Sequence, residues 1–245
     1  YAPSAYDRSV FFVGPCFPPQ AQPDAQQPAD DEVIAWMDKM HAEGRRVVCI
    51  NMGTIYYYQP QDYAHMVQAL HMIHEQNPNV AFLWKIAQRP KHVQNIPSED
   101  EAALPPYVRR LSWIPSMTAV MEHPALAVMM HHGGGNSLNE CLAYGIPQFC
   151  ISQWVDTHDI GLCIRHSGVG LWSEYSPDFV PEDICSQLLQ LVEDKDHTFR
   201  YTALSWKLKT QQAGGTKFAA DLIQSYVTDY TYAGGSSKAP MPHAM

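Results

Sequence analysis

Residues 125–137 read ALAVMMHHGGGNS, an apolar run followed by two histidines, three glycines and a polar pair. The run is typical of a buried β-strand, and the apolar spacing over 136–143 predicts a helix just beyond the glycines. Glycines let the backbone approach a ligand closely, and a helix start offers unpaired N–H groups and the positive end of the helix dipole. The stretch therefore predicts an anion site at a strand-to-helix turn, although a glycine turn beside a packed histidine pair explains it equally well.

The same alternation of strands and helices extends on both sides of this stretch. Apolar runs predict strands at 47–50, 80–86, 110–113, 125–130 and 148–151. Helical spacing predicts helices over 33–44, 61–76, 117–122, 136–143, 158–166, 181–193, 196–212 and 215–230. Strands that are apolar almost throughout indicate a parallel sheet covered on both faces. The predicted fold class is therefore α/β, with a doubly wound, Rossmann-like parallel sheet.

The two ends of the chain differ in composition from its middle. The sequence begins at Tyr1 and is rich in proline up to Pro28, which is typical of a linker. A glycine- and serine-rich stretch near the C-terminus predicts a frayed end. We therefore expect a linker segment at 1–29, one domain over 30–230 and a flexible tail at 231–245, in a chain cut from a longer protein.

Composition excludes several classes of protein. Of the 245 residues, 46% are hydrophobic and 17% are charged, which is ample for a buried core. Sixteen Lys and Arg against 25 Asp and Glu give a net charge of -9, and the basic residues are scattered, so we expect no nucleic-acid partner. The longest apolar stretch, 125–130, is far too short to span a bilayer. The six cysteines form no C-x-x-C pair, so we interpret them as reduced, buried thiols of a cytoplasmic protein.

Ligands bind open parallel sheets beyond the carboxyl ends of the strands, so the loops there are candidates for a site. Gly53-Thr54 can offer backbone N–H groups and a hydroxyl to a phosphate, or can form only a tight turn. Asp156 can bind sugar hydroxyls or cap a helix. Trp113 can stack on a planar base or simply pack. Taken singly, each loop leaves both interpretations open.

The histidine pair, His131 and His132, raises the question of a metal, with Asp156 or His158 as a further ligand. Adjacent side chains on a strand point to opposite faces, so the two histidines cannot easily face one ion. The sequence therefore predicts no metal site. It also predicts no cofactor, because residues 51–54 lack the glycine fingerprint of a nicotinamide-dependent dehydrogenase.

Together the loops resemble the donor-binding signature of UDP-dependent glycosyltransferases of family 1 and GT-B type. The matching positions are Trp113, Pro115, His123, Pro124, His132, Gly134, Asn136, Ser137, Glu140, Gly145, Pro147 and Asp156. Gly53-Thr54 resembles the Gly-Ser that follows the first strand of the family's C-terminal domain, and residues 13–15 resemble its interdomain linker. Over residues 10–230 the chain is thus similar to the C-terminal half of a GT-B enzyme.

The resemblance implies a role for each matched position. Trp113 would stack on uracil, the Ile114 backbone would pair with the base edge, and Glu140 would accept hydrogen bonds from the ribose. The residues that would hold the diphosphate are Gly53, Thr54, His132, Gly134, Asn136 and Ser137. Asp156 and Thr157 would face the transferred sugar.

Four features depart from the plant members of this family. They are an additional residue between Trp113 and His123, Ser116 in place of Gln, Gly135 in place of Trp, and Thr157 in place of the Gln that follows Asp156. The pattern Trp-x-Asp-Thr at 154–157 resembles fungal members instead.

The resemblance implies an inverting transfer of a hexose from a UDP-sugar, with UDP-glucose the expected donor. The acceptor would be a hydroxyl of a small molecule such as a lipid, a sterol or a secondary metabolite. In the family the general base and the acceptor pocket lie in the N-terminal domain, so the resemblance assigns no catalytic residue to this chain and implies an acceptor-binding domain as its partner. We expect the chain alone to bind donor without transferring sugar. The alternative is a non-catalytic donor-binding subunit that pairs with a separate acceptor-binding protein.

Overall fold

The computed structural model describes residues 11–17, 28–99 and 103–232. The chain divides into two compact units, residues 25–207 and a second unit of residues 1–24 with 208–245. The domain end that we expected at residue 230 therefore falls within the second unit. Most of the expected linker and of the expected tail lies outside the described residues, so those boundaries stay predictions.

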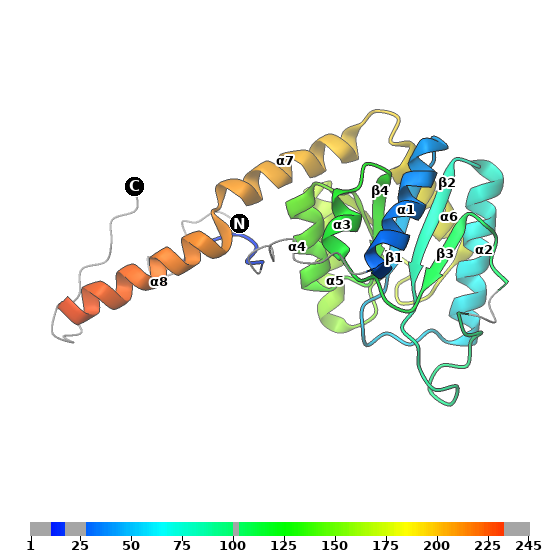
Figure 1. The fold of residues 1–245 in the computed structure, drawn as a ribbon, viewed down its shortest axis with the longest axis horizontal. Helices are drawn as coiled ribbons and strands as arrows, with labels where there is room; N and C mark the ends of the chain where they lie inside the picture. Colours follow the sequence, from blue (N-terminus) through cyan, green and yellow to red (C-terminus); the bar gives the residue numbers. More distant parts are fainter. Residues whose placement is uncertain (1–10, 18–27, 100–102, 233–245) are drawn as a thin grey trace. The chain divides into compact units, whose positions relative to one another are not determined.

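The larger unit is built on a parallel sheet with the strand order β3-β2-β1-β4-β5-β6 (Figure 1). The strands are β1 Arg46–Asn51, β2 Val80–Lys85, β3 Val108–Leu111, β4 Leu126–His131, β5 Gln148–Cys150 and β6 Gly170–Trp172. In this order the chain runs outward from β1 in one direction and then returns to its other side with β4. Such a reversal defines a doubly wound sheet, so the predicted fold class is confirmed.

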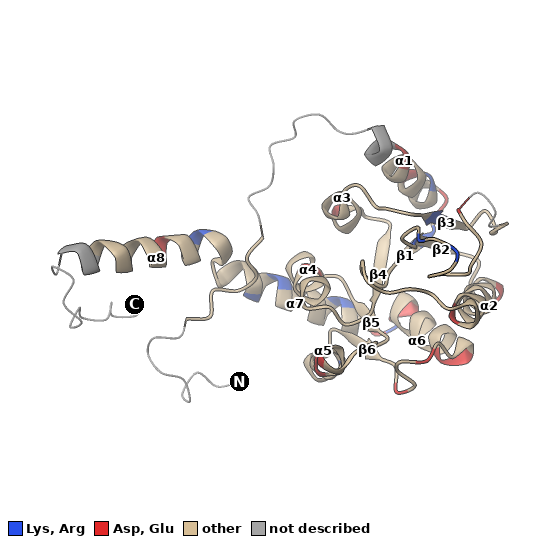
Figure 2. Ribbon diagram, turned by 90° about the horizontal axis from the view of Figure 1, so that it is seen from below, with Lys and Arg blue, Asp and Glu red and all other residues tan. Residues whose placement is uncertain are grey.

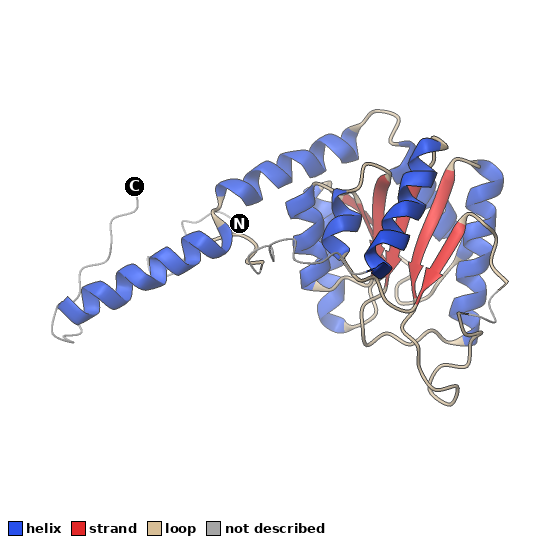
Figure 3. Cartoon of the chain, in the orientation of Figure 1, coloured by secondary structure: helices blue, strands red, loops and turns tan. Residues whose placement is uncertain are grey.

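Helices cover both faces of the sheet (Figure 3). Their bounds are α1 Pro28–Ala42, α2 Pro60–Gln76, α3 Met117–Glu122, α4 Gly135–Tyr144, α5 Val155–Ser167 and α6 Pro181–Glu193. Helices α2 and α6 pack against each other and against one face, whereas α1, α3, α4 and α5 lie against the other. Because side chains alternate along a strand, Val48 and Ile50 of β1 enter the first core and Val47 and Cys49 enter the second. Both faces of the central strands are therefore apolar, as the sequence indicated.

Several elements differ from the expectation; helix α1, for example, begins at Pro28 rather than at residue 33. Strand β6 was not predicted, because its three residues are too few to show a pattern. Strand β3 begins and ends two residues earlier than expected, and the next free backbone N–H, that of Ser112, donates to the Glu99 carboxylate at 2.9 Å. Helix α5 begins at Val155 rather than at 158, because the Thr157 side chain caps its first turn.

Two further helices complete the described chain. Helix α7, Thr198–Gln212, begins in the larger unit, and α8, Gly215–Tyr232, lies in the second; the predictions of helices over 196–212 and 215–230 are confirmed. Within the second unit, the N–H of Gly215 donates to the Val13 carbonyl at 2.7 Å, and the Phe11 ring lies edge-on to Tyr226 at 6.4 Å. The segment that resembles an interdomain linker thus pairs with the start of α8.

The surface features agree in part with the composition argument. Figure 2 shows Asp and Glu on the outer helices α2, α5 and α6, and Lys and Arg spread over separate elements. None of the helices within the described residues is long and apolar enough to cross a membrane. All six cysteines are free thiols, but the expectation that they are buried is wrong for Cys16 and Cys163, which are exposed.

Candidate functional site

A cleft of about 560 Å³ opens at the carboxyl ends of β1 to β4. This is the crevice beside β1 where the strand order reverses, the usual ligand site of doubly wound sheets. The cleft is lined by Asn51, Gly53, Thr54, Ile55, Lys85, Trp113, Ile114, Met117, His132, Gly134, Gly135, Asn136, Ser137 and Glu140. Nine of the eleven residues proposed from the sequence therefore meet in one cavity, and the two that do not are Asp156 and Thr157.

Two glycines make room for the His132 ring. A Cβ on Gly53 would stand 2.7 Å from Cε1 of this ring, and a Cβ on Gly134 would stand 2.8 Å from the same atom. Gly53 also has a φ of +86°, which side chains rarely adopt. The glycines at the ends of β1 and β4 thus hold the imidazole between two stretches of backbone, at the floor of the cleft.

His131, the other histidine of the pair, points away from the cleft. Its Nε2 donates to the Gln148 side-chain oxygen at 2.9 Å, and its Nδ1 accepts from the N–H of Gly133 at 3.0 Å. Complete burial lowers the pKa of His131 to about 4, so this imidazole is neutral near pH 7. The prediction that the pair faces opposite sides is confirmed. Within the described residues no group of three or more His, Cys, Asp or Glu could hold a metal ion.

The environment of His132 also favours its neutral form. Burial lowers its pKa, the Lys85 charge lowers it further, and the Asp156 carboxylate opposes both. The ring lies edge-on to Trp154 with 5.3 Å between centroids. Its buried Nδ1 has no hydrogen-bond partner among the described residues. A polar ligand in the cleft can form a hydrogen bond with this unsatisfied nitrogen.

The start of α4 forms one wall of the cleft. Gly134 is its N-cap and, having no side chain, leaves the first N–H groups of the helix without a side-chain cap. Asn136 and Ser137 lie in the first turn and line the cleft. No acidic residue of that turn competes for the positive end of the helix dipole. Unpaired N–H groups at the positive end of a helix dipole are the chemistry that suits an anion, and the anion site expected from the glycine-rich sequence stays a prediction.

Aromatic and carboxylate groups lie on the remaining walls. The Trp113 side chain, just beyond β3, is 60% exposed and offers its ring to the cleft, whereas Ile114 beside it is buried. Glu140, one turn into α4, is half-buried, and this burial raises the pKa of its carboxyl. An exposed indole is suited to stack on a planar base, and a carboxylate is suited to accept hydroxyl hydrogen bonds.

Two polar residues of the cleft were missed by the sequence argument. Lys85 ends the otherwise apolar β2, and its side-chain amine donates to the Gly53 carbonyl at 2.9 Å. Asn51 ends β1, and its side-chain oxygen accepts from the N–H of Gly53 at 3.1 Å. The signal was present, because a charged or polar residue that closes an apolar strand lies at the ligand-binding edge of a parallel sheet.

The two expected sugar-binding residues lie outside the cleft lining, and one needs correction. Thr157 is 1% exposed, and its hydroxyl accepts from the N–H groups of Gln153 and Trp154 and donates to the Trp154 carbonyl. Its oxygen is therefore occupied in shaping the turn and is not open to a ligand. Asp156 is exposed in the first turn of α5, close enough for its charge to act on His132.

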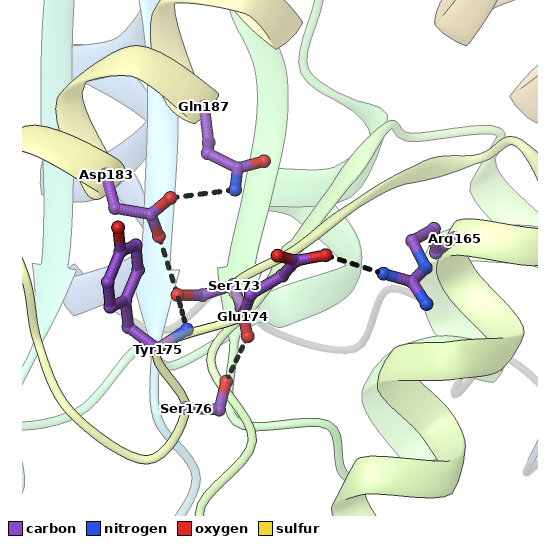
Figure 4. A network of polar contacts seen from close by, with 7 residues as sticks. All are labelled: Arg165, Ser173, Glu174, Tyr175, Ser176, Asp183 and Gln187. Carbon is purple, nitrogen blue, oxygen red and sulfur yellow. Dashed lines mark hydrogen bonds and ion pairs between the residues drawn. The ribbon is translucent and has the colours of Figure 1, made fainter.

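A network of polar contacts joins the loop after β6 to helix α6 (Figure 4). The Ser173 hydroxyl donates to Asp183 at 2.6 Å, and the Ser176 hydroxyl donates to the Ser173 carbonyl at 2.8 Å. The Ser176 oxygen in turn accepts from the N–H of Ser152 at 3.0 Å, just after β5. Helix α6 is thereby connected to the loop that carries Asp156.

Comparison with known proteins agrees with this geometry. Residues 91–219, just over half of the chain, match the family described as erythromycin biosynthesis protein CIII-like, C-terminal domain. Erythritol-mannosyl-transferase 1 of Mycosarcoma maydis is 26% identical over 86% of this chain and 43% of its own length. Limonoid UDP-glucosyltransferase of Citrus unshiu is 27% identical over 89% of this chain and 44% of its own length. The chain thus spans less than half the length of these relatives.

Solved structures show the same fold. The crystal structure of a UDP-glucose: anthocyanidin 3-O-glucosyltransferase in complex with UDP superposes with a TM-score of 0.64 and 19% identity, over 88% of this chain and 45% of that one. The family match over residues 91–219 confirms the resemblance to family 1 glycosyltransferases that the motifs indicated. This chain belongs to the erythromycin biosynthesis protein CIII-like C-terminal domain family of GT-B glycosyltransferases.

Proposed function

We propose that this chain is the donor-binding half of an inverting glycosyltransferase and that its cleft holds a UDP-sugar, with UDP-glucose the expected donor. The observation that supports this most strongly is the convergence of three kinds of group in one cavity. An exposed indole, a carboxylate and an uncapped helix start beside a neutral histidine line the same cleft. These groups suit a base, a ribose and a diphosphate respectively.

In the proposed complex each part of the donor has its own partners. Uracil stacks on Trp113 and pairs with the backbone of Ile114, and Glu140 accepts hydrogen bonds from the ribose hydroxyls. The diphosphate occupies the start of α4, where its partners are Gly53, Thr54, His132, Gly134, Asn136 and Ser137. Asp156, the exposed acid in the first turn of α5, binds hydroxyls of the sugar.

The proposed reaction is a direct displacement at the anomeric carbon. The acceptor oxygen bonds to that carbon from the face opposite the phosphate, the carbon–phosphate oxygen bond breaks, and a general base takes the acceptor proton. The α4 dipole and His132 stabilise the negative charge that gathers on departing UDP. No metal or other cofactor is needed in this scheme.

We further propose that the base and the acceptor pocket belong to an acceptor-binding domain that completes the enzyme. The relatives support this, since each is more than twice as long as the part that this chain matches. The acceptor is then a hydroxylated small molecule, and the chain alone binds donor without transferring sugar.

The identity of the sugar depends on few residues of this chain. The two relatives are named for a mannosyl and a glucosyl transfer, so the names alone leave the sugar open. Because the Thr157 hydroxyl is occupied within its own turn, Asp156 is the residue of this turn that can distinguish sugars. A donor panel should therefore vary the sugar as well as the base.

Thermal unfolding with nucleotides tests the proposal. We expect UDP and UDP-glucose to raise the melting temperature, whereas ADP-glucose and NAD do not. A ligand present at 100 times its dissociation constant adds about 2.7 kcal/mol to the free energy of unfolding. UDP-glucuronate, UDP-N-acetylglucosamine and GDP-mannose complete the panel and rank the sugars and bases.

Trp113→Ala should weaken UDP binding about 5- to 150-fold, because stacking of a base on an aromatic ring contributes about 1–3 kcal/mol. Titration calorimetry at 25 °C measures the change. The matched control is Tyr201→Ala, which removes an exposed ring on α7 that does not line the cleft. Equal affinity of UDP for wild type and Trp113→Ala would refute the assigned base site.

A further inference from the structure

Lys85 is a buried cation without an anionic partner. Its side chain belongs to a residue that is 5% exposed, at the end of β2. Within the described residues no carboxylate lies at ion-pair distance from its amine. The neighbours that act on its charge are the Arg89 guanidinium, the Cys49 thiol and the His132 ring. A buried charge costs free energy unless it is paired, so this arrangement needs an explanation.

The ammonium is nevertheless held in one place. It donates to the Gly53 carbonyl at 2.9 Å and lies 5.1 Å from the centre of the Trp113 ring. The first contact ties it to the loop after β1, and the second ties it to the indole beyond β3. An ammonium has three donor hydrogens, so these contacts leave capacity for a ligand oxygen. Lys85 itself lines the cleft.

We propose that Lys85 is a specificity-determining residue that pairs with the diphosphate of the donor and thereby distinguishes a nucleotide from a nucleoside. The inference rests on the proposed function, since it takes the diphosphate of the proposed ligand as the anionic partner of the Lys85 amine. Among the cleft-lining residues described, Lys85 is the only lysine or arginine, and the surroundings of His132 favour its neutral form. The pairing also stabilises the charge that UDP gains when the sugar leaves.

The electrostatics of the cleft agree with this assignment. Burial lowers the pKa of Lys85, and the nearby Arg89 lowers it further. A bound diphosphate would oppose both effects, because an anion favours the charged amine. The cleft thus holds a cation whose surroundings are unfavourable until an anion arrives.

Titration calorimetry with UDP and with uridine tests the proposal on the whole chain. Lys85→Met should weaken UDP binding about 10- to 100-fold, the range for a hydrogen bond to a charged group. Uridine, which has no phosphate, should lose less than about threefold. Lys85→Arg keeps the charge and should retain the preference for UDP. Lys195→Met is the matched control, since it removes an exposed lysine that is paired with Glu193 outside the cleft.

Each other outcome contradicts the proposal in a recognisable way. If Lys85→Met weakens UDP and uridine equally, the residue acts only through Gly53 and Trp113 and does not read the diphosphate. If Lys85→Arg loses the preference for UDP over uridine that wild type shows, the positive charge is not the recognised feature. This comparison needs only wild type and Lys85→Arg, so it stands even where Lys85→Met fails to fold. If wild type and Lys85→Met bind UDP with equal affinity, only the inference about Lys85 is refuted. If wild type binds neither UDP nor uridine, the proposed function is refuted as well.

Discussion

Gly133→Ala is expected to lower the free energy of unfolding by about 3 kcal/mol or more. The residue has a φ of +88°, and a Cβ there would stand 2.7 Å from the Thr157 carbonyl oxygen. A left-handed backbone costs an alanine about 1–2 kcal/mol, and overpacking against a rigid neighbour adds about 1–3 kcal/mol. Because the obstructing atom is backbone, the first turn of α5 would have to move. Urea unfolding at pH 7.5 measures the loss.

The same glycine triplet supplies the matched control. No atom lies within 4 Å of a Cβ on Gly135, which occupies the first turn of α4 without a positive φ. Gly135→Ala should therefore change stability by less than about 1 kcal/mol. Similar unfolding curves for the two variants would show that the close approach of the β4–α4 turn to α5 is not required by the fold.

The stability of the wild type should fall by about 2 kcal/mol between pH 7.5 and pH 5 because of His131. Its pKa is about 4 in the folded protein and near 6.5 in the unfolded chain, so the unfolded state binds more protons between these values. The contribution of His131 is complete above pH 6.5 and is lost as the pH falls toward 4. Urea unfolding at several pH values measures the slope.

A substitution isolates this contribution from those of the other histidines. His131→Asn should lower the free energy of unfolding at every pH. The loss of stability between pH 7.5 and pH 5 should, however, be about 2 kcal/mol smaller than in wild type. His92→Gln, which removes an exposed histidine of the loop after β2, should leave the slope unchanged. An equal slope in wild type and His131→Asn would mean that the imidazole is not kept neutral by its bonds to Gln148 and Gly133.

The fold could be predicted from the sequence where burial is symmetrical. Strands such as β1 and β2 are apolar on both faces, so their sequences show uninterrupted hydrophobic runs that only a covered parallel sheet explains. Short elements escape this logic. Gly170 allows the edge strand β6 to pair closely with β5, because a Cβ there would stand only 1.9 Å from the Gln148 oxygen. A strand of three residues is too short for a sequence pattern to predict this pairing.

The residues that line the cleft could be predicted where a motif and a strand end coincide. The position of His132 follows from its place after β4, and the structure adds that Gly53 and Gly134 enclose its ring. The function of Thr157 could not be read in the same way. A threonine one residue beyond Asp156 can face a ligand or cap the turn, and only the three-dimensional path of the β5–α5 loop determines that its hydroxyl binds Gln153 and Trp154.

Hydrogen exchange of the chain with and without saturating UDP, followed by mass spectrometry, tests most directly whether the cleft beside β1 and β4 is the donor site. Bound UDP should slow exchange in peptides that cover 51–55, 112–117 and 132–140, which carry the cleft-lining groups. Exchange in peptides 41–46 and 191–200, which lie at the amino ends of the strands and away from the cleft, should be unchanged. If UDP does not protect 132–140, or protects only 41–46 and 191–200, the cleft beside β1 and β4 is not the donor site.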